Sequence, residues 1–249
     1  MTERASSRDR WAEQVAALEA RGGRPSGGGA SVGRARKQPL SSERIVEVAF
    51  DIIAAEGYEA LTMRRIAVAL GTGPASLYAH VRNKAELDDL LIGRLCAAVP
   101  LPEPSATDWR AQFLDVCRHL RDEYLRYPGI SAAAFTAAPN SLETMRISEG
   151  LLSILLEAGV EPNRAAWTID AAFLYVSAYS LEHSLREQAE ERDGEPARDA
   201  GELAERLRML PPTLFPNTVA HADALTSGRG HERFDFTLEL LLRGVSDGS

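Results

Sequence analysis

The stretch "GTGPASLYAHVRNKAEL", residues 71–87, holds one helix stop and two helix starts within seventeen residues. Gly71 predicts the end of a preceding helix, because glycine readily adopts the left-handed conformation that terminates helices. Pro74 suits the first position of the next helix, where its missing N–H leaves no hydrogen bond unmade. Asn83 and Glu86 have the spacing of a capping box and predict the start of a longer helix. A very short helix is therefore held between two defined turns.

Two further helices are predicted upstream of this stretch. Ser41 or Ser42 caps the first, which Gly57 ends, and Thr62 caps the second. Both carry apolar residues at helical spacing. Two helices joined by the four-residue turn at 70–73 have the dimensions of a helix-turn-helix. The same arrangement also occurs as a plain three-helix motif in proteins that never touch nucleic acid, so the spacing alone leaves both interpretations open.

The charge of the chain is unevenly distributed. The 249 residues have a formal net charge of −8, yet residues 21–44 carry six basic side chains against one acidic side chain. Residues 99–249 carry 14 basic and 24 acidic side chains. This asymmetry favours a basic end that meets nucleic acid and an acidic body that does not.

Composition and targeting signals predict a cytoplasmic protein that does not enter a membrane. No apolar run reaches the roughly 18 residues that a bilayer span needs. The N-terminus "MTERASSRDRWAEQ" carries charges where a signal peptide needs an apolar stretch. Cys96 and Cys117 have no metal-ligand spacing, so we expect reduced thiols, no metal site and no cofactor.

We divide the chain into three parts. Residues 1–40 are predicted to form a flexible basic arm with a short helix over 9–20. Residues 41–95 form the helix-turn-helix domain, and residues 105–246 form a larger helical domain with a mobile acidic loop at 187–205. Apolar spacing predicts four helices in the last part, at 109–127, 142–158, 162–190 and 233–245. Period-two alternation is nearly absent, so the fold class is all-α.

The segment "LTMRRIAVALGTGPASLYAHVRNKAEL" resembles the DNA-binding domain of the tetracycline-repressor (TetR) family of bacterial transcription regulators. The resemblance runs without a gap from Ser41 to Leu91. It includes the Thr-x-Arg opening of the second helix, the Leu-Tyr-x-His-Val turn and the Asn-Lys-x-x-Leu start of the fourth helix. The C-terminal half, ending in "ERFDFTLELLLRGV", is similar to the variant nearest tetracycline repressor itself.

The resemblance implies an N-terminal three-helix DNA-binding domain joined to a larger helical domain for ligand binding and dimerisation. It implies a homodimer on a palindromic double-stranded operator, released by a small-molecule inducer such as an antibiotic or a metabolite. The histidine cluster that binds metal in a tetracycline sensor has no counterpart near "LCAAVPLPEP". Tetracycline–magnesium is therefore not the expected ligand.

The resemblance also assigns DNA-binding roles. Thr62 caps a helix whose N-terminus faces a phosphate, and Arg64 occupies the position that reaches a guanine, whose O6/N7 pair suits a guanidinium. Tyr78, His80 and Lys84 occupy positions that bind the DNA backbone. Core packing of Tyr78 and a hydrogen bond from His80 to a buried carbonyl stay open as alternatives.

The leading edge of the third helix departs from tetracycline repressor. Ser76 lies at a base-proximal position, while Pro74 and Ala75 offer only apolar contacts, for example to a thymine methyl. Direct readout by this helix should be poor. The arm could compensate, because Gly-Arg-Pro at 23–25 resembles an AT-hook core, in which arginine enters a narrow minor groove. We expect the arm to contact DNA through four cations, with incidental charge in a linker as the alternative: Arg24, Arg34, Arg36 and Lys37.

The late helices are predicted to form the dimer surface. The segment "AAWTIDAAFLYVSAYSLEHSL", residues 165–185, is apolar nearly all round. The last helix has apolar or small residues at helical spacing, with Phe236 and Leu240 beside them: Phe234, Thr237, Leu238, Leu241 and Val245. Two copies of each helix could make a four-helix interface. An intramolecular core is the alternative for these positions.

An inducer pocket is implied between the helices predicted at 109–127, 142–158 and 162–190. Asp170 falls inside an apolar run, where a buried carboxylate needs a partner: an arginine, a helix cap or the ligand. Ten residues are the expected lining: Phe113, Cys117, Tyr124, Met145, Ser148, Leu152, Trp167, Asp170, Phe173 and Ser177.

The sequence therefore predicts a ligand-released transcriptional repressor. An activator, or an architectural DNA-binding protein without a ligand, is the second interpretation. An enzyme is not expected, because Cys117 and His119 lie two residues apart on a helix and face different ways.

Overall fold

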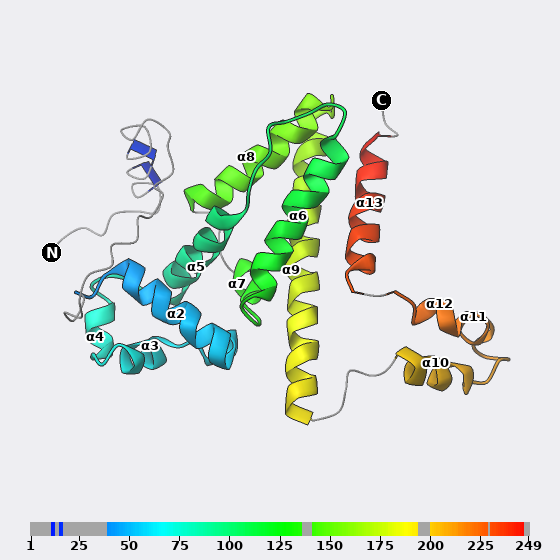
Figure 1. Ribbon diagram of the computed structural model, residues 1–249, viewed down its shortest axis with the longest axis horizontal. Helices are drawn as coiled ribbons and strands as arrows, with labels where there is room; N and C mark the ends of the chain where they lie inside the picture. Colours follow the sequence, from blue (N-terminus) through cyan, green and yellow to red (C-terminus); the bar gives the residue numbers. More distant parts are fainter. Residues whose placement is uncertain are drawn as a thin grey trace.

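The computed structural model describes residues 11–12, 15–16, 39–135, 141–193, 200–228 and 230–246. Regular structure within these ranges is helical and includes no strand, which confirms the all-α class (Figure 1). None of the described helices is long and apolar enough to cross a membrane. The four described residues of the short helix predicted over 9–20 are helical. The arm cations Arg24, Arg34, Arg36 and Lys37 lie outside the described residues.

The N-terminal domain begins with three α-helices and a 3₁₀ turn: α2 (Ser42–Glu56), η1 (Tyr58–Ala60), α3 (Met63–Ala69) and α4 (Pro74–Leu77). The predicted caps are present. The Ser41 hydroxyl accepts a hydrogen bond from the Arg44 amide at 3.2 Å, and Thr62 Oγ1 accepts one from the Arg65 amide at 3.0 Å. Each hydroxyl satisfies an amide that has no partner within its own helix.

The turn before α4 depends on Gly71, which has φ of 64°. The Gly71 amide donates to the Val68 carbonyl at 3.1 Å, and the Thr72 amide donates to the Ala67 carbonyl at 3.0 Å. This pair of bonds is the Schellman arrangement, in which a left-handed residue lets the backbone satisfy the last carbonyls of a helix. The chain then reverses within a few residues and begins α4 at Pro74.

The helix α5 (Lys84–Ala98) connects the two domains (Figure 1). The Asn83 side chain caps it by accepting from the Glu86 amide at 2.8 Å. This helix packs against α2 as well as against the C-terminal domain. The boundary predicted at residue 95 therefore falls inside α5, because one uninterrupted helix serves both domains.

The C-terminal domain is a bundle around a continuous apolar core. Its helices are α6 (Trp109–Leu125), α7 (Ser131–Ala134), α8 (Leu142–Glu157), α9 (Pro162–Asp193) and α13 (Glu232–Ser246). The long helix α9 packs against α6, α7, α8 and α13, so it is the central element (Figure 1). Phe113, Ile147, Leu151 and Phe234 are fully buried at these contacts. The four predicted helices are thus present, with small differences at their ends.

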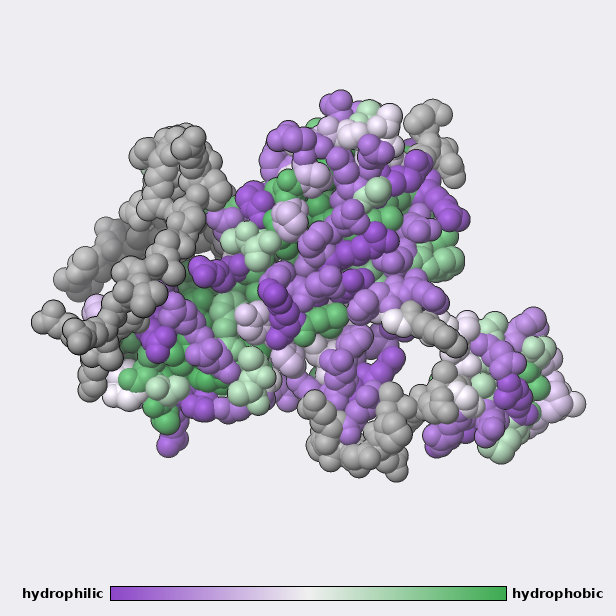
Figure 2. Space-filling model, viewed as in Figure 1, coloured by the Kyte–Doolittle hydropathy of each residue, from purple (hydrophilic) through white to green (hydrophobic). Residues whose placement is uncertain are grey.

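A lobe of short helices projects from this bundle: α10 (Ala200–Arg208), α11 (Pro216–Ala220) and α12 (Ala222–Leu225). Figure 2 shows it beside the main body, with hydrophobic and hydrophilic atoms mixed on its surface. The loop predicted over 187–205 is helical at both ends, because α9 continues to Asp193 and α10 begins at Ala200. Ion pairs one turn apart, such as Glu202 with Arg206, favour helix in so charged a sequence.

We expect Gly71→Ala to lower the free energy of unfolding by about 1–2 kcal/mol, because a Cβ is disfavoured in the left-handed conformation. No neighbouring atom lies within 4 Å of the added Cβ, so the loss would come from the backbone alone. Gly244→Ala is the control: Gly244 lies inside α13 without a positive φ, where alanine should maintain or raise stability. Urea unfolding at equal protein concentration measures both, and equal effects would contradict the prediction.

Candidate DNA interface and ligand pocket

The short helix α4 is held to the N-terminal domain by buried side chains at and just after its C-terminal end. Leu77 and Val81 are fully buried in the core of the N-terminal domain. The side chains of the leading edge are all exposed: Pro74, Ala75 and Ser76. Tyr78 is 50% exposed, so it is not mainly a core residue. The His80 ring is also exposed, while its backbone carbonyl accepts a hydrogen bond from Ser42 Oγ at 3.2 Å.

The cations near α4 divide into paired and unpaired groups. Arg65 forms an ion pair with Glu56, and Arg82 forms one with Glu86. Arg64 is exposed and has no hydrogen-bond or ion-pair partner among the described residues. A guanidinium without an internal partner can reach a base edge or a phosphate without first breaking a salt bridge. Unlike Arg65 and Arg82, Arg64 thus keeps its guanidinium free of ion pairs with the described residues.

Lys84 has an internal role that the sequence did not indicate. Its ammonium pairs with the buried carboxylate of Asp88 and donates to the Tyr58 hydroxyl at 2.8 Å. It also lies 4.0 Å from the centroid of the Tyr58 ring. Burial lowers the pKa of Lys84, and the hydrogen bond and charge of Asp88 oppose that shift. The expected phosphate contact would require this ammonium to bind a third partner in addition to Asp88 and Tyr58.

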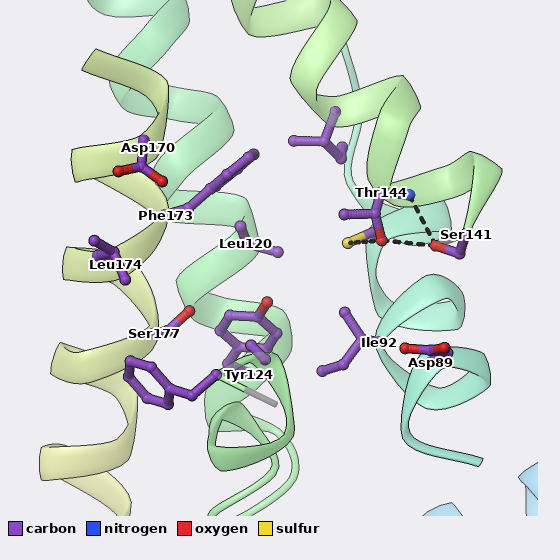
Figure 3. A pocket seen from close by; sticks show the side chains of 14 residues that line it. Asp89, Ile92, Leu120, Tyr124, Ser141, Thr144, Asp170, Phe173, Leu174 and Ser177 are labelled. Carbon is purple, nitrogen blue, oxygen red and sulfur yellow. Dashed lines mark hydrogen bonds between the residues drawn. The ribbon is translucent and has the colours of Figure 1, made fainter. Parts of the chain in front are cut away.

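A cavity of about 260 Å³ lies among α5, α6, α7, α8 and α9 (Figure 3). Its lining is mostly apolar, with two carboxylates and several hydroxyls. The lining residues are Asp89, Ile92, Cys96, Leu120, Tyr124, Ala134, Phe135, Ser141, Thr144, Ile147, Asp170, Phe173, Leu174 and Ser177. An apolar cavity with a few convergent polar groups is the usual form of a small-molecule site.

Four of the ten predicted lining residues belong to this cavity: Tyr124, Asp170, Phe173 and Ser177. Phe113 and Cys117 instead lie in the core, and Trp167 is 74% exposed on the opposite side of α9 from the core. On α8 the cavity meets Ser141, Thr144 and Ile147 rather than three residues expected from that helix: Met145, Ser148 and Leu152. The prediction chose the right helices but the wrong face of α8.

The α5 wall and the α7 wall were missed. Asp89, Ile92 and Cys96 follow one another at i, i+3 and i+7, which places them on one face of α5. That spacing could have indicated a pocket wall, but α5 was interpreted only as the link between domains. The helix α7 is too short to produce a periodic signal, so nothing in the sequence indicated Ala134 and Phe135.

Asp170 is exposed rather than buried, which corrects the sequence interpretation. It lies at the rim of the cavity on α9, near Phe173 and Leu174 (Figure 3). No arginine or helix cap satisfies it, since Asp170 has no hydrogen-bond or ion-pair partner among the described residues. The apolar run around it does not bury it because one side of α9 is uncovered.

The thiols and the phenol near the cavity are neutral groups. Burial raises the pKa of Cys96 to about 11 and that of Cys117 to about 12. Burial also raises the pKa of Tyr124 well above its ordinary value. A thiol held in its protonated form is a poor nucleophile. No cluster of three potential metal ligands occurs in the described part of the chain.

The cavity and the DNA-binding domain meet through the α6–α7 loop. The Tyr58 amide donates to the Pro128 carbonyl at 2.9 Å, and the rings of Phe50 and Tyr127 lie 4.5 Å apart. The same loop leads directly into α7, whose C-cap Phe135 lines the cavity. The loop is therefore a second physical connection between the cavity and the DNA-binding domain, in addition to α5.

The surfaces of α9 and α13 differ from the expected dimer surface. Phe234, Leu238 and Val245 are buried within the chain, whereas Phe236 is 58% exposed. The predicted apolar stripe of α13 thus belongs largely to the core of the chain. The exposed apolar side chains of α13, Phe236 and Leu240, lie beside that stripe. We call the exposed apolar side chains of these two adjacent helices the open face: Trp167, Leu174, Leu185, Phe236 and Leu240.

We expect Asp88→Asn to lower the free energy of unfolding by about 1–3 kcal/mol, because it leaves the half-buried Lys84 ammonium without its counter-charge. Adding Lys84→Met should recover part of that loss, since both charges are then removed. A double-mutant cycle by urea unfolding measures the coupling. Additive effects of the two substitutions would show that the pair contributes nothing to stability.

Two family models match the chain. Residues 45–88 match the model described as bacterial regulatory proteins, tetR family, and residues 101–248 match the tetracyclin repressor-like C-terminal domain. The chain is 30% identical over 224 residues to the HTH-type transcriptional repressor DrrR1 of Streptomyces coeruleorubidus, covering 85% of this chain and 79% of that protein. It is 27% identical over 215 residues to the class A tetracycline repressor protein from transposon 1721 of Escherichia coli, covering 83% and 91%.

Solved structures agree with these matches. The Streptomyces coelicolor TetR family protein ActR, crystallised in complex with actinorhodin, is 37% identical, with a TM-score of 0.76 over 85% of this chain and 98% of that chain. Its form without ligand is 36% identical, with a TM-score of 0.74 over 84% and 98%. The helix-turn-helix, the C-terminal bundle and these matches together show that the chain belongs to the TetR family of DNA-binding transcriptional regulators.

Proposed function

We propose that this protein is a cytoplasmic, homodimeric repressor that leaves its operator when a small molecule fills the cavity between α5 and α9. The observation that carries the proposal is the continuity of α5. Six residues, 78–83, separate α4 from α5, and the middle of α5 lines the cavity. A ligand that contacts Ile92 or Cys96 therefore touches the same rigid helix that supports the DNA-binding surface.

Exposure supports six DNA-contacting side chains: Arg64, Pro74, Ala75, Ser76, Tyr78 and His80. The Arg64 guanidinium makes a bidentate contact to a guanine base, and Tyr78 and His80 contact phosphates. Thr62 contributes chiefly through its helix cap, and Lys84 chiefly through its pair with Asp88. Because the leading edge of α4 is apolar, part of the affinity is assigned to the N-terminal arm.

The ligand acts by favouring one spacing of the two DNA-binding domains over another. It has two routes, the rigid body of α5 and the α6–α7 loop that holds Tyr58 through Pro128. The ligand weakens operator binding only to the extent that it binds the released conformation more tightly than the DNA-bound one. The ligand-bound ActR complex shows that a relative with this fold accommodates a small molecule.

Pairing of two chains occurs through the open face of α9 and α13. Large apolar side chains that stay exposed on neighbouring helices indicate a protein contact. Two copies of each helix would form a four-helix interface. A two-fold dimer places two α4 helices on related half-sites, so the operator is palindromic. An activator, or an architectural DNA-binding protein without a ligand, would have the same geometry. The effect of the ligand on DNA binding distinguishes these alternatives from a repressor that the ligand releases.

Selection from a pool of random double-stranded DNA tests the DNA-binding part of the proposal, and we expect a palindromic sequence to be enriched. On that sequence, Arg64→Ala should weaken binding by about five- to 100-fold, because each lost bidentate contact to guanine costs about 1–3 kcal/mol. Arg65→Ala is the matched control, since Arg65 is already paired with Glu56. Enrichment of no sequence, or equal losses for the two variants, would contradict this assignment.

We expect Phe236→Glu to shift the chain from dimer to monomer at micromolar concentration, because a charge in an apolar interface is costly to desolvate. Leu156→Glu is the control, since Leu156 is a comparably exposed apolar residue (43%) on α8, away from the open face. Sedimentation velocity measures both. A dimer that persists with Phe236→Glu and dissociates with Leu156→Glu would place the interface elsewhere.

A further inference from the structure

We infer that the inducer is an amphiphile with a compact apolar or aromatic body and a protonated amine, and that the carboxylate of Asp170 binds the amine. This inference rests on the proposed function, because it takes the cavity to be the inducer site. It follows from the charges around the cavity, from the position of Asp170 and from the size of the cavity.

The charged side chains that line the cavity are both carboxylates, Asp89 on α5 and Asp170 on α9. No arginine, lysine or histidine belongs to the described lining. The Cys96 thiol and the Tyr124 hydroxyl are neutral, because burial raises both pKa values. The segment 136–140, next to the cavity wall in sequence, reads Thr-Ala-Ala-Pro-Asn and carries no charged side chain. The described lining therefore supplies no cation to the Asp170 carboxylate.

Two arginines on helices that line the cavity are already bound to other groups. Arg146 on α8 donates to the carbonyls of Cys96 and Val99, each at 2.7 Å, and pairs with Glu143 at 3.3 Å. These bonds hold its guanidinium at the C-terminal end of α5, where a cation satisfies free carbonyls. On α6, Arg121 pairs with Asp122. An anionic ligand could use either of these two guanidinium groups only by breaking its present contacts.

Asp170 is better placed than Asp89 to bind a ligand cation. Asp170 has no partner among the described residues, whereas Asp89 takes part in an interaction. The two carboxylates lie on opposite walls, with Leu120 and Phe173 between them (Figure 3). A ligand can thus bury its apolar body against these side chains and extend an ammonium to the rim. Because Asp170 is exposed, binding costs little desolvation of the carboxylate.

The remaining polar groups suit a neutral donor or acceptor on the ligand. The hydroxyls of Ser141 and Thr144 lie 2.6 Å apart on the α8 wall, opposite α9 (Figure 3). The cavity of about 260 Å³ is near the lower end of ligand sites, which span about 300–1,000 Å³. A fused bicyclic ring with one amine is therefore a suitable first probe.

Three probes of nearly equal shape test the inference: 1-(aminomethyl)naphthalene, 1-naphthalenemethanol and 1-naphthoic acid, which are a cation, a neutral alcohol and an anion at pH 7. Titration calorimetry on the full chain should show the amine binding about fivefold more tightly than the alcohol, and the acid binding most weakly. Asp170→Asn should remove the preference for the amine and leave the alcohol unchanged. Glu149→Gln removes one charge from α8 outside the cavity and should change neither.

Several outcomes would overturn the inference: acid binding as tight as amine binding, an amine preference that survives Asp170→Asn, or no binding of any naphthalene. Operator binding is measured on the same preparations, so the two proposals fail separately. If the acid binds and releases the operator, the ligand class is wrong but the ligand-released repressor stands. If the chain binds no DNA, the proposed function fails whatever the probes show.

Discussion

The rigidity of α5 is the constraint on which the rest of the molecule depends. This helix of 15 residues begins at the turn that ends the DNA-binding surface and continues into the wall of the cavity. Its first turn is held by the Asn83 cap and by the Lys84–Asp88 pair beneath Tyr58. In the proposed mechanism, a helix fixed in this way moves as a unit, so that a small displacement at Ile92 would reach the N-terminal domain, where α5 packs against α2.

The ion pair of Lys84 and Asp88 explains how the junction between the two domains can be closely packed although it contains charged side chains. A lone ammonium or carboxylate at this depth would favour an open, solvated junction. Together with the Tyr58 hydroxyl they satisfy each other, and Tyr58 also donates its amide to Pro128 in the α6–α7 loop. Three segments distant in sequence therefore meet around Tyr58: the 3₁₀ turn η1, the start of α5 and the α6–α7 loop. Their hydrogen bonds and ion pair link the N-terminal domain to the C-terminal domain.

The sequence predicted the N-terminal domain better than the cavity, and the reason is physical. Caps, proline starts and glycine stops are local signals, so Thr62, Pro74 and Gly71 marked their helices correctly. The cavity depends on which faces of five helices meet, and periodicity leaves helix rotation uncertain by one residue. Because of that uncertainty, Met145 of α8 was predicted to line the cavity, whereas its neighbour Thr144 does so. Asp170 was predicted as buried because an apolar run does not reveal which side of a helix the rest of the chain will leave uncovered.

The exposed side of α9 connects this last point to regulation. Leu174 belongs both to the open face and to the lining of the cavity, one turn from Asp170. Pairing of two chains along α9 would therefore remove water from the rim of the cavity. Removing water strengthens the attraction between a carboxylate and a bound cation, and it also adds the cost of desolvating the carboxylate. On this argument the affinity for an amine would differ between monomer and dimer, and ligand affinity and dimerisation would be thermodynamically coupled.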